Sequence, residues 1–131
     1  MPSVGLGDFV RSFLERVVNR HDLGAVDELV APDYRGTGLG WAPDLESLRR
    51  FYTWQARWRP DWRIDVQETV EVGDHVAVRA YAGGTIAHDD DGQSLEAPFR
   101  RDVEWLAVYR VAADRIVEVN FLASADRHDV G

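Results

Sequence analysis

The stretch WRPDWRIDVQETVEVGDHVAVR, residues 58–79, contains the end of a helix, a stop, two strands and the turn between them. Pro60 cannot continue a helix because it lacks an N–H and its ring clashes with the preceding turn. Apolar and polar residues then alternate over 62–67, which is the period of a half-buried strand. Gly73-Asp74 supplies a turn, and the alternation resumes over 75–79. The stretch therefore predicts an antiparallel hairpin that follows a helix.

Three helices are expected before the hairpin. Apolar residues recur at helical spacing over residues 5–20, which predicts an amphipathic helix. Asp22 is expected to cap a shorter second helix that ends at Pro32. Asp44 is expected to cap a third helix over residues 45–58.

Strand patterns fill the rest of the chain. Strands are expected over residues 62–72, 74–87, 98–111 and 115–125, with a short extended segment over 34–40. Three helices followed by a meander of strands is an α+β arrangement, in which the helices pack on one face of a curved sheet. No linker or repeat divides the sequence, so residues 1–131 are expected to form a single domain.

The composition disfavours several classes of protein. The chain of 131 residues has no cysteine, which excludes a disulfide, a thiolate nucleophile and a cysteine-based zinc site. Its net charge of −8 disfavours nucleic-acid binding, which needs clustered basic side chains. There is no apolar run of the roughly 20 residues that a membrane span needs, and no signal-peptide pattern. We therefore expect a soluble, cytoplasmic protein with no nucleic-acid or membrane partner.

Five short motifs occur in an order that is typical of one family. They are Ala31-Pro32-Asp33-Tyr34, Arg59-Pro60-Asp61, Gly73-Asp74-His75-Val76-Ala77-Val78-Arg79, Gly84-Thr85-Ile86-Ala87-His88 and Arg115-Ile116-Val117-Glu118. With these motifs the chain resembles the SnoaL-like polyketide cyclases of the nuclear-transport-factor-2-like superfamily. The resemblance implies a cone of three helices on a curved antiparallel or mixed sheet, which encloses a pocket for a hydrophobic small-molecule substrate. It also implies a homodimer through the outer face of the sheet, and aldol ring closure without a cofactor.

The last strand departs from the family pattern. The resemblance aligns Asn120 with a Trp of the family and Ser124 with its catalytic Asp. Asp126 could reach the position of that Asp through a bulge or a shift of register; alternatively, it belongs to a solvated tail. The acid/base of the family is therefore absent from its usual place, and catalysis needs another group.

The strand over residues 99–109 offers a replacement acid. Asp102 and Glu104 share one face of it, and if that face is concave, burial would raise the pKa of Glu104 and make it a base. The alternative is that both acids are solvated or paired with arginine side chains, as most charged strand residues are. The candidate catalytic residues are Glu104 as acid/base, with Asp102, Tyr34 and Asn120 as further polar groups.

Aromatic residues are abundant, with five Trp and five Phe in the chain. They are expected to line a cavity for a flat polycyclic or polyene ligand, or alternatively to form an ordinary core. The candidate substrate-binding residues are Phe51, Trp54, Trp58, Tyr109 and Phe121, with Trp41 close by.

No metal site is expected. His21, His75, His88 and His128 lack the ligand spacing of a zinc site, and residues 88–92 lack the spacing of a calcium loop. The sequence favours a cofactor-independent enzyme of secondary metabolism that acts on a hydrophobic polyketide-like intermediate by cyclisation, isomerisation or hydration. A non-catalytic small-molecule-binding protein and a hydroxylase-like accessory protein on the same fold are the alternatives.

Overall fold

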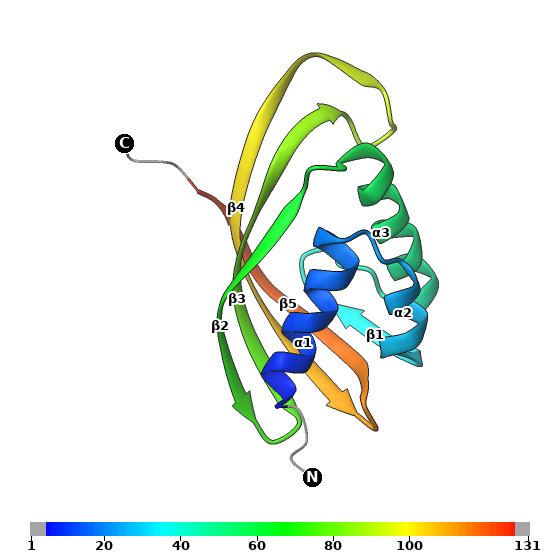
Figure 1. The fold of residues 1–131 in the computed structure, drawn as a ribbon, viewed down its shortest axis with the longest axis vertical. Coiled ribbons are helices and arrows are strands. Elements are labelled where there is room, and N and C mark those ends of the chain that lie inside the picture. The colour runs from blue at the N-terminus through cyan, green and yellow to red at the C-terminus, as the bar shows by residue number, and fades with distance from the viewer. Residues whose placement is uncertain (1–4, 128–131) are drawn as a thin grey trace.

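A helical layer covers one face of a five-stranded sheet (Figure 1). The computed structural model describes residues 5–127, so His128 lies outside the described residues. The helices are α1 (Leu6–Leu14), the π-helical turn η1 (Glu15–Asn19), α2 (Gly24–Leu29) and α3 (Leu45–Trp58). The strands are β1 (Val30–Thr37), β2 (Arg63–Val72), β3 (His75–His88), β4 (Ser94–Ala112) and β5 (Arg115–Asp126). The predicted α+β fold is confirmed.

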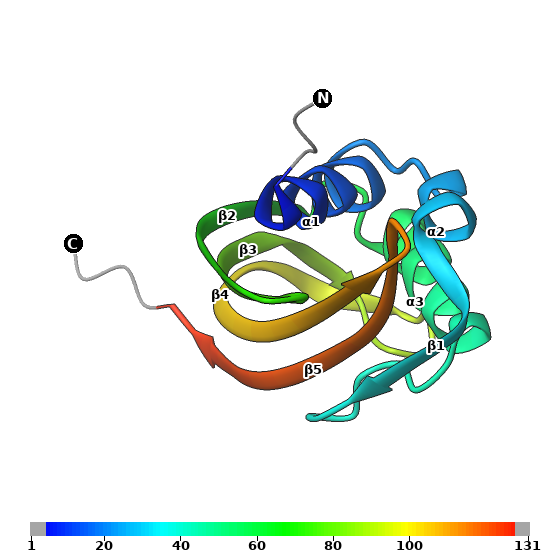
Figure 2. The ribbon, with the colours of Figure 1, turned by 90° about the horizontal axis from the view of Figure 1, so that it is seen from below.

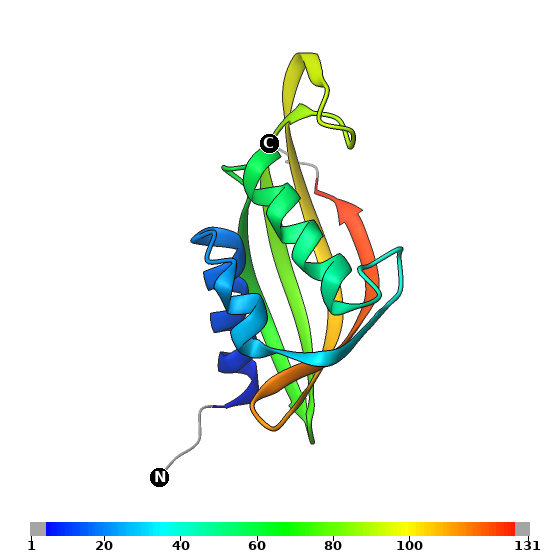
Figure 3. The ribbon, with the colours of Figure 1, turned by 90° about the vertical axis from the view of Figure 1, so that its right-hand side faces the viewer.

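The sheet is mixed and strongly curved. Its strand order is β1-β5-β4-β3-β2, in which β2 to β5 form an antiparallel meander and β1 runs parallel to β5. Figures 2 and 3 show the long strands curling around α1 and α3, as a cone opened on one side. Strands with a right-handed twist coil in this way when helices cover a single face.

The core lies between α1 and the inner face of the sheet. Phe13 and Val17 from the first helical segment and Val78 from β3 are each at most 2 % exposed. The helical spacing of the first pair and the strand parity of the third direct all of them into one layer. Within residues 5–127, no helix is both long enough and apolar enough to cross a membrane.

The second helix is shorter than predicted. α2 ends at Leu29, and Val30 already begins β1. Pro32 does not end the helix but lies inside this strand, which is at the edge of the sheet. An edge strand tolerates proline because one side of it has no neighbouring strand that needs its N–H.

The two predicted helix caps have different outcomes. Asp44 accepts a hydrogen bond from the Ser47 amide at 2.8 Å and caps α3, as predicted. The prediction of Asp22 as a cap is wrong, because Leu23 precedes α2 and no side chain caps it. The carboxylate of Asp22 pairs instead with the guanidinium of Arg16 at 2.8 Å.

Candidate functional site

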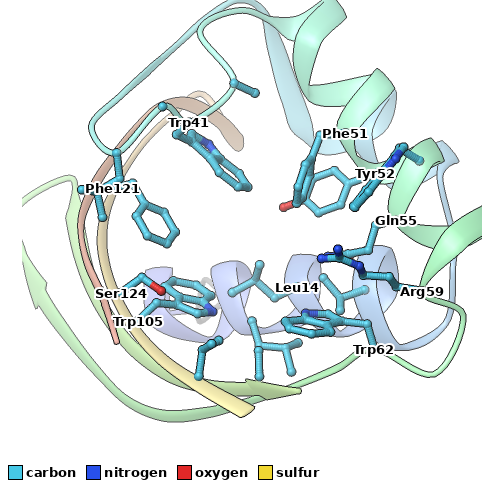
Figure 4. A pocket seen from close by; sticks show the side chains of 18 of the residues that line it. Leu14, Trp41, Phe51, Tyr52, Gln55, Arg59, Trp62, Trp105, Phe121 and Ser124 are labelled. Carbon is cyan, nitrogen blue, oxygen red and sulfur yellow. The ribbon is translucent and has the colours of Figure 1, made fainter. Parts of the chain in front are cut away.

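A cavity of about 790 Å³ lies between α3 and the inner face of the sheet. Figure 4 shows aromatic rings projecting into it from both sides. The aromatic residues that line it are Trp41, Phe51, Tyr52, Trp54, Trp62, Trp105, Tyr109 and Phe121. The volume is within the range of pockets that enclose small-molecule ligands.

The rings on the sheet side form a stack. The ring of Phe121 lies 5.4 Å from Trp41 and 5.5 Å from Trp105, with interplanar angles of 22° and 30°. Trp41 also meets Phe51 of α3 edge-on, at 5.0 Å. The wall therefore runs from β4 across to α3, and its nearly parallel faces suit a planar ligand.

Tyr34 supports this wall from behind. Its side chain is buried and is not among the residues that line the cavity. The hydroxyl accepts a hydrogen bond from Trp41 Nε1 at 2.8 Å and donates one to the carbonyl oxygen of Ala42 at 3.2 Å. Burial raises the pKa of Tyr34 to about 12, so the phenol stays neutral. Tyr34, a predicted catalytic residue, thus acts on the cavity through Trp41 and Ala42, which both line it.

The face of β4 that lines the cavity is not the face that carries Glu104. Trp105 lines the cavity, and because successive residues of a strand alternate, Glu104 points to the outer face. There its carboxylate pairs with Arg79 at 3.1 Å, and Asp102 pairs with Arg100 at 3.0 Å. The prediction that Asp102 and Glu104 lie on the concave face is therefore wrong. The alternative, that both acids are solvated or paired with arginine side chains, describes them.

Two more predicted residues lie outside the cavity. The side-chain oxygen of Asn120 accepts a hydrogen bond from the Thr37 hydroxyl at 3.1 Å, which joins β5 to β1. Trp58 packs on the ring of His88 at 4.7 Å, beside the β3–β4 hairpin. Asn120 as an orienting group and Trp58 as a cavity wall are therefore corrected. Of the predicted substrate-binding residues, four do line the cavity, namely Phe51, Trp54, Tyr109 and Phe121. Their contact with a substrate stays a prediction.

A β-bulge brings Ser124 into the cavity. Phe121 and Ala123 pair with consecutive residues of β4, so Leu122 is an extra residue in β5. Because of this residue, Phe121 and Ser124 both face inward despite their odd spacing (Figure 4). The cavity thus has a hydroxyl where the resemblance places a carboxylate.

Arg59 brings a positive charge to the cavity wall. Its guanidinium carbon lies 4.6 Å from the ring centroid of Trp54 and 6.0 Å from that of Trp62. The side chain is 17 % exposed, and its buried Nε has no hydrogen-bond partner among residues 5–127. Burial lowers the pKa of Arg59, because it disfavours the charged form. Sequence reasoning used this arginine only as part of a family motif.

The other ionisable residues of the wall are arginines and tyrosines. Arg50 and Arg101 also line the cavity, and the lining residues include no Asp, Glu or His in the described chain. Burial raises the pKa of both Tyr52 and Tyr109, so their phenols stay protonated and can donate hydrogen bonds. Within residues 5–127, no three His, Asp or Glu side chains cluster in a way that could hold a metal ion. The arrangement can bind a flat apolar molecule and stabilise negative charge on its oxygen atoms.

Sequence reasoning missed several lining residues, among them Trp62 and Trp105. A signal for Trp105 was present, since Val103, Trp105 and Tyr109 share a face of their strand that carries no charge over residues 103–109. An uncharged face is the one that packs against helices. Arg59 gave no comparable signal, because a charged residue at the end of a helix is normally solvated.

Comparison with known proteins agrees with this architecture. The sequence matches the family described as SnoaL-like domain over residues 10–119. It is 28% identical to IdmH, a candidate polyketide cyclase from Streptomyces antibioticus, over 94% of this chain and 92% of that one, with a TM-score of 0.74. No match was found among the curated proteins.

Two more distant structures share the fold alone. A candidate polyketide cyclase from Acidithiobacillus ferrooxidans is 19% identical over 95% of this chain and 91% of its own, with a TM-score of 0.72. AclR, a candidate hydroxylase from Streptomyces galilaeus, is 15% identical over 93% and 88%, with a TM-score of 0.73. Proteins with different described activities thus have this curved sheet and helical layer in common, so the activity has to be argued from the cavity.

Proposed function

The chain belongs to the SnoaL-like family, and on this premise we propose that it is a cofactor-independent, polyketide cyclase-like enzyme of secondary metabolism. It binds a flat, hydrophobic, oxygen-bearing intermediate and promotes its ring closure or isomerisation. The observation that carries this proposal is the aromatic cavity of about 790 Å³ between α3 and the sheet.

Confinement is the first contribution of the cavity. The stacked rings of Trp41, Phe121 and Trp105 favour a substrate that lies flat against the sheet. When the cavity holds a flexible substrate in a folded shape, the two reacting carbons of the substrate lie close together. This lowers the entropic cost of bringing them together during the reaction.

Stabilisation of an enolate oxygen is the second contribution. The neutral phenols of Tyr52 and Tyr109 and the cation of Arg59 line one apolar space. Such donors lower the barrier when negative charge develops on a carbonyl oxygen. Because no carboxylate or imidazole is among the described lining residues, no side chain is assigned as the base, and the α-proton passes to solvent water. The substrate is then a compound that enolises readily, such as a β-dicarbonyl.

The same absence of a base favours a second candidate, a small-molecule-binding protein without chemistry. This candidate predicts that an aromatic β-dicarbonyl compound binds in the cavity and leaves unchanged. The two candidates therefore differ in turnover and agree in binding.

A cavity-blocking pair of variants tests the proposal. Ser124→Phe fills the cavity, whereas Ala125→Phe adds the same ring next to it on the outer face of β5, opposite Glu104. The substrate is a synthetic aryl triketone whose intramolecular aldol closure changes its ultraviolet absorbance. We expect the protein to accelerate closure over buffer, Ser124→Phe to lose about tenfold or more of this acceleration, and Ala125→Phe to keep it.

The other outcomes are equally informative. Quenching of tryptophan fluorescence by the triketone, without faster closure, supports the binding protein. If the triketone causes neither quenching nor faster closure, both candidates are contradicted.

A further inference from the structure

We propose that the ligand of the cavity is an apolar acid, and that Arg59 binds its carboxylate. The inference rests on the proposed function in that the cavity must bind a small hydrophobic molecule, and it adds the charge of that molecule.

The backbone of the turn after α3 fixes Arg59. Its N–H donates to the carbonyl oxygen of Gln55 at 2.8 Å, and its own carbonyl oxygen accepts from the Trp62 amide at 3.0 Å. Two residues after Arg59, the Asp61 carboxylate accepts from the amide of Thr85 at 3.0 Å and from its hydroxyl at 2.6 Å, which ties the turn to β3. The base of the Arg59 side chain is therefore in place before any ligand arrives.

The guanidinium has little to bind within the protein. Its Nε is buried and finds no acceptor among residues 5–127. The carboxylate within 4.0 Å of it in this part of the chain belongs to Asp90, which is 3.9 Å away and 97% exposed. A loose pair with a solvated carboxylate contributes little, whereas a buried donor without an acceptor is costly. The side chain is still 17% exposed, so a ligand carboxylate can reach its terminal N–H groups and give the guanidinium the acceptor that the protein does not supply.

The nearby charges also favour an anion. Arg101 lines the same cavity, and its charge adds to burial in lowering the pKa of Arg59, against an opposing effect of Asp90. Arg101 itself is paired with Asp126 at 3.0 Å, and Arg50 is exposed to solvent, so Arg59 is the buried cation available to a ligand. The chain as a whole has 23 acidic and 15 basic residues. The cavity wall is thus positively charged, whereas the chain as a whole is negatively charged.

The geometry suits a carboxylate in particular. The planes of Trp54 and Trp62 flank the guanidinium, and cation–π contact of this kind orients it. An oriented guanidinium presents a fork of N–H donors that matches the two oxygens of a carboxylate. The apolar part of the ligand then extends toward the stacked rings around Phe121.

A matched pair of probes tests the proposal. 1-Pyrenebutyric acid and 1-pyrenebutanol share a flat apolar body and differ in the charge of the end group. Binding is measured at pH 7.5 and low salt, from quenching of tryptophan fluorescence and by calorimetry. We expect the acid to bind about tenfold more tightly than the alcohol, as a charge-assisted hydrogen bond allows.

Two variants assign the preference to one side chain. Arg59→Met removes the charge but keeps an unbranched chain between the indoles, and it should bind both probes with equal affinity. The control is Arg57→Met, from the same helix end, because Arg57 lies 4.7 Å over the ring of Trp58 and is not among the lining residues. This control should keep the tenfold preference. If Arg59→Met does not fold, Arg59→Lys takes its place. This variant retains the charge, so it should keep part of the preference for the acid.

Each remaining outcome counts against the proposal in a different way. Equal affinity of the unchanged protein for both probes overturns the inference and leaves the proposed function standing. A preference that survives in Arg59→Met but disappears in Arg101→Met moves the anion site to Arg101. If neither probe binds, the proposed function fails together with the inference.

Discussion

The hydroxyl of Tyr34 shows how a single buried polar atom can shape a cavity that it does not touch. It accepts from Trp41 and donates to the carbonyl of Ala42, and so it fixes the indole that begins the aromatic stack. Tyr34→Phe should lower the free energy of unfolding by about 1–2 kcal/mol, because both partners are then left unsatisfied.

Urea unfolding measures this effect, and Tyr81→Phe provides the comparison. The Tyr81 hydroxyl has a weaker partner, Arg79 at 3.4 Å, in a half-buried setting, so its loss should change stability by less than about 0.5 kcal/mol. Equal losses in the two variants would argue against a structural role for Tyr34.

Three buried phenols set an alkaline limit to stability. Burial raises the pKa of Tyr34 to about 12 and raises that of Tyr52 and Tyr109 as well. An unfolded tyrosine ionises near pH 10, while the folded chain still holds these protons. Their contribution is therefore fully present below about pH 10 and is lost as the pH rises through about 12 and beyond.

The expected slope in this range is about 1.4 kcal/mol per pH unit for each phenol. Urea unfolding at intervals from pH 8 to 11.5 measures it, and Tyr52→Phe should make the decline shallower. A free energy of unfolding that stays constant over this range would contradict the assignment.

At this scale the site could be predicted only in part. Aromatic composition indicated a cavity wall, and four of the five residues proposed as substrate-binding do line the cavity. The orientation of Glu104 was only weakly indicated, because Arg101 puts a charge on the opposite face of the strand too, and the packing of the helical layer makes one of the two faces inner. Ser124 could not be placed either, since its inward direction depends on the extra residue Leu122.

Among the elements, the turn between α3 and β2 packs its backbone directly against β3. A Cβ atom at Gly84 of β3 would lie 2.9 Å from the Cα of Trp62 and 3.0 Å from a carboxylate oxygen of Asp61. Gly84→Ala should therefore push this turn away from β3, at a loss of about 1–3 kcal/mol in stability.

Gly24→Ala is a matched control for this variant. A Cβ there would have one heavy atom nearby, Asp22 Oδ1 at 3.5 Å. Because Gly24 begins α2, alanine should instead stabilise the protein by about 0.5–1 kcal/mol. Thermal unfolding compares the two, and a neutral Gly84→Ala would show that the turn moves freely.

Most elements follow from local patterns, and the failures have local causes. Alternation predicted the strands on either side of Gly73, and Asp44 marked the start of α3. The end of α2 was misplaced because Pro32 has two meanings, a helix stop or an edge-strand residue. Pro32 lies in a strand because β1 pairs in parallel with β5, far along the chain, as Val30 does with Ile116. No local sequence pattern indicates this pairing.

For the whole molecule, the resemblance implies a homodimer through the outer face of the sheet. Leu106 is on that face and is 41% exposed. We expect sedimentation to give a dimer, and Leu106→Arg to shift it to monomer because a charge would be buried in the interface. Val72→Arg alters a residue that is 71% exposed at the β2–β3 hairpin and should leave the dimer intact. A monomeric wild-type protein would contradict the expectation.

The turn over residues 59–62 also has a spectroscopic consequence. It connects β3 with the segment before α2, because Asp61 accepts from Thr85 and the Pro60 carbonyl oxygen lies 2.9 Å from His21 Nε2. The amide proton of Thr85 points at a carboxylate and not at a neighbouring strand, so its chemical shift and exchange rate depend on where that carboxylate sits. An anion bound to Arg59 would change the electric field at this turn, and this one resonance would report it.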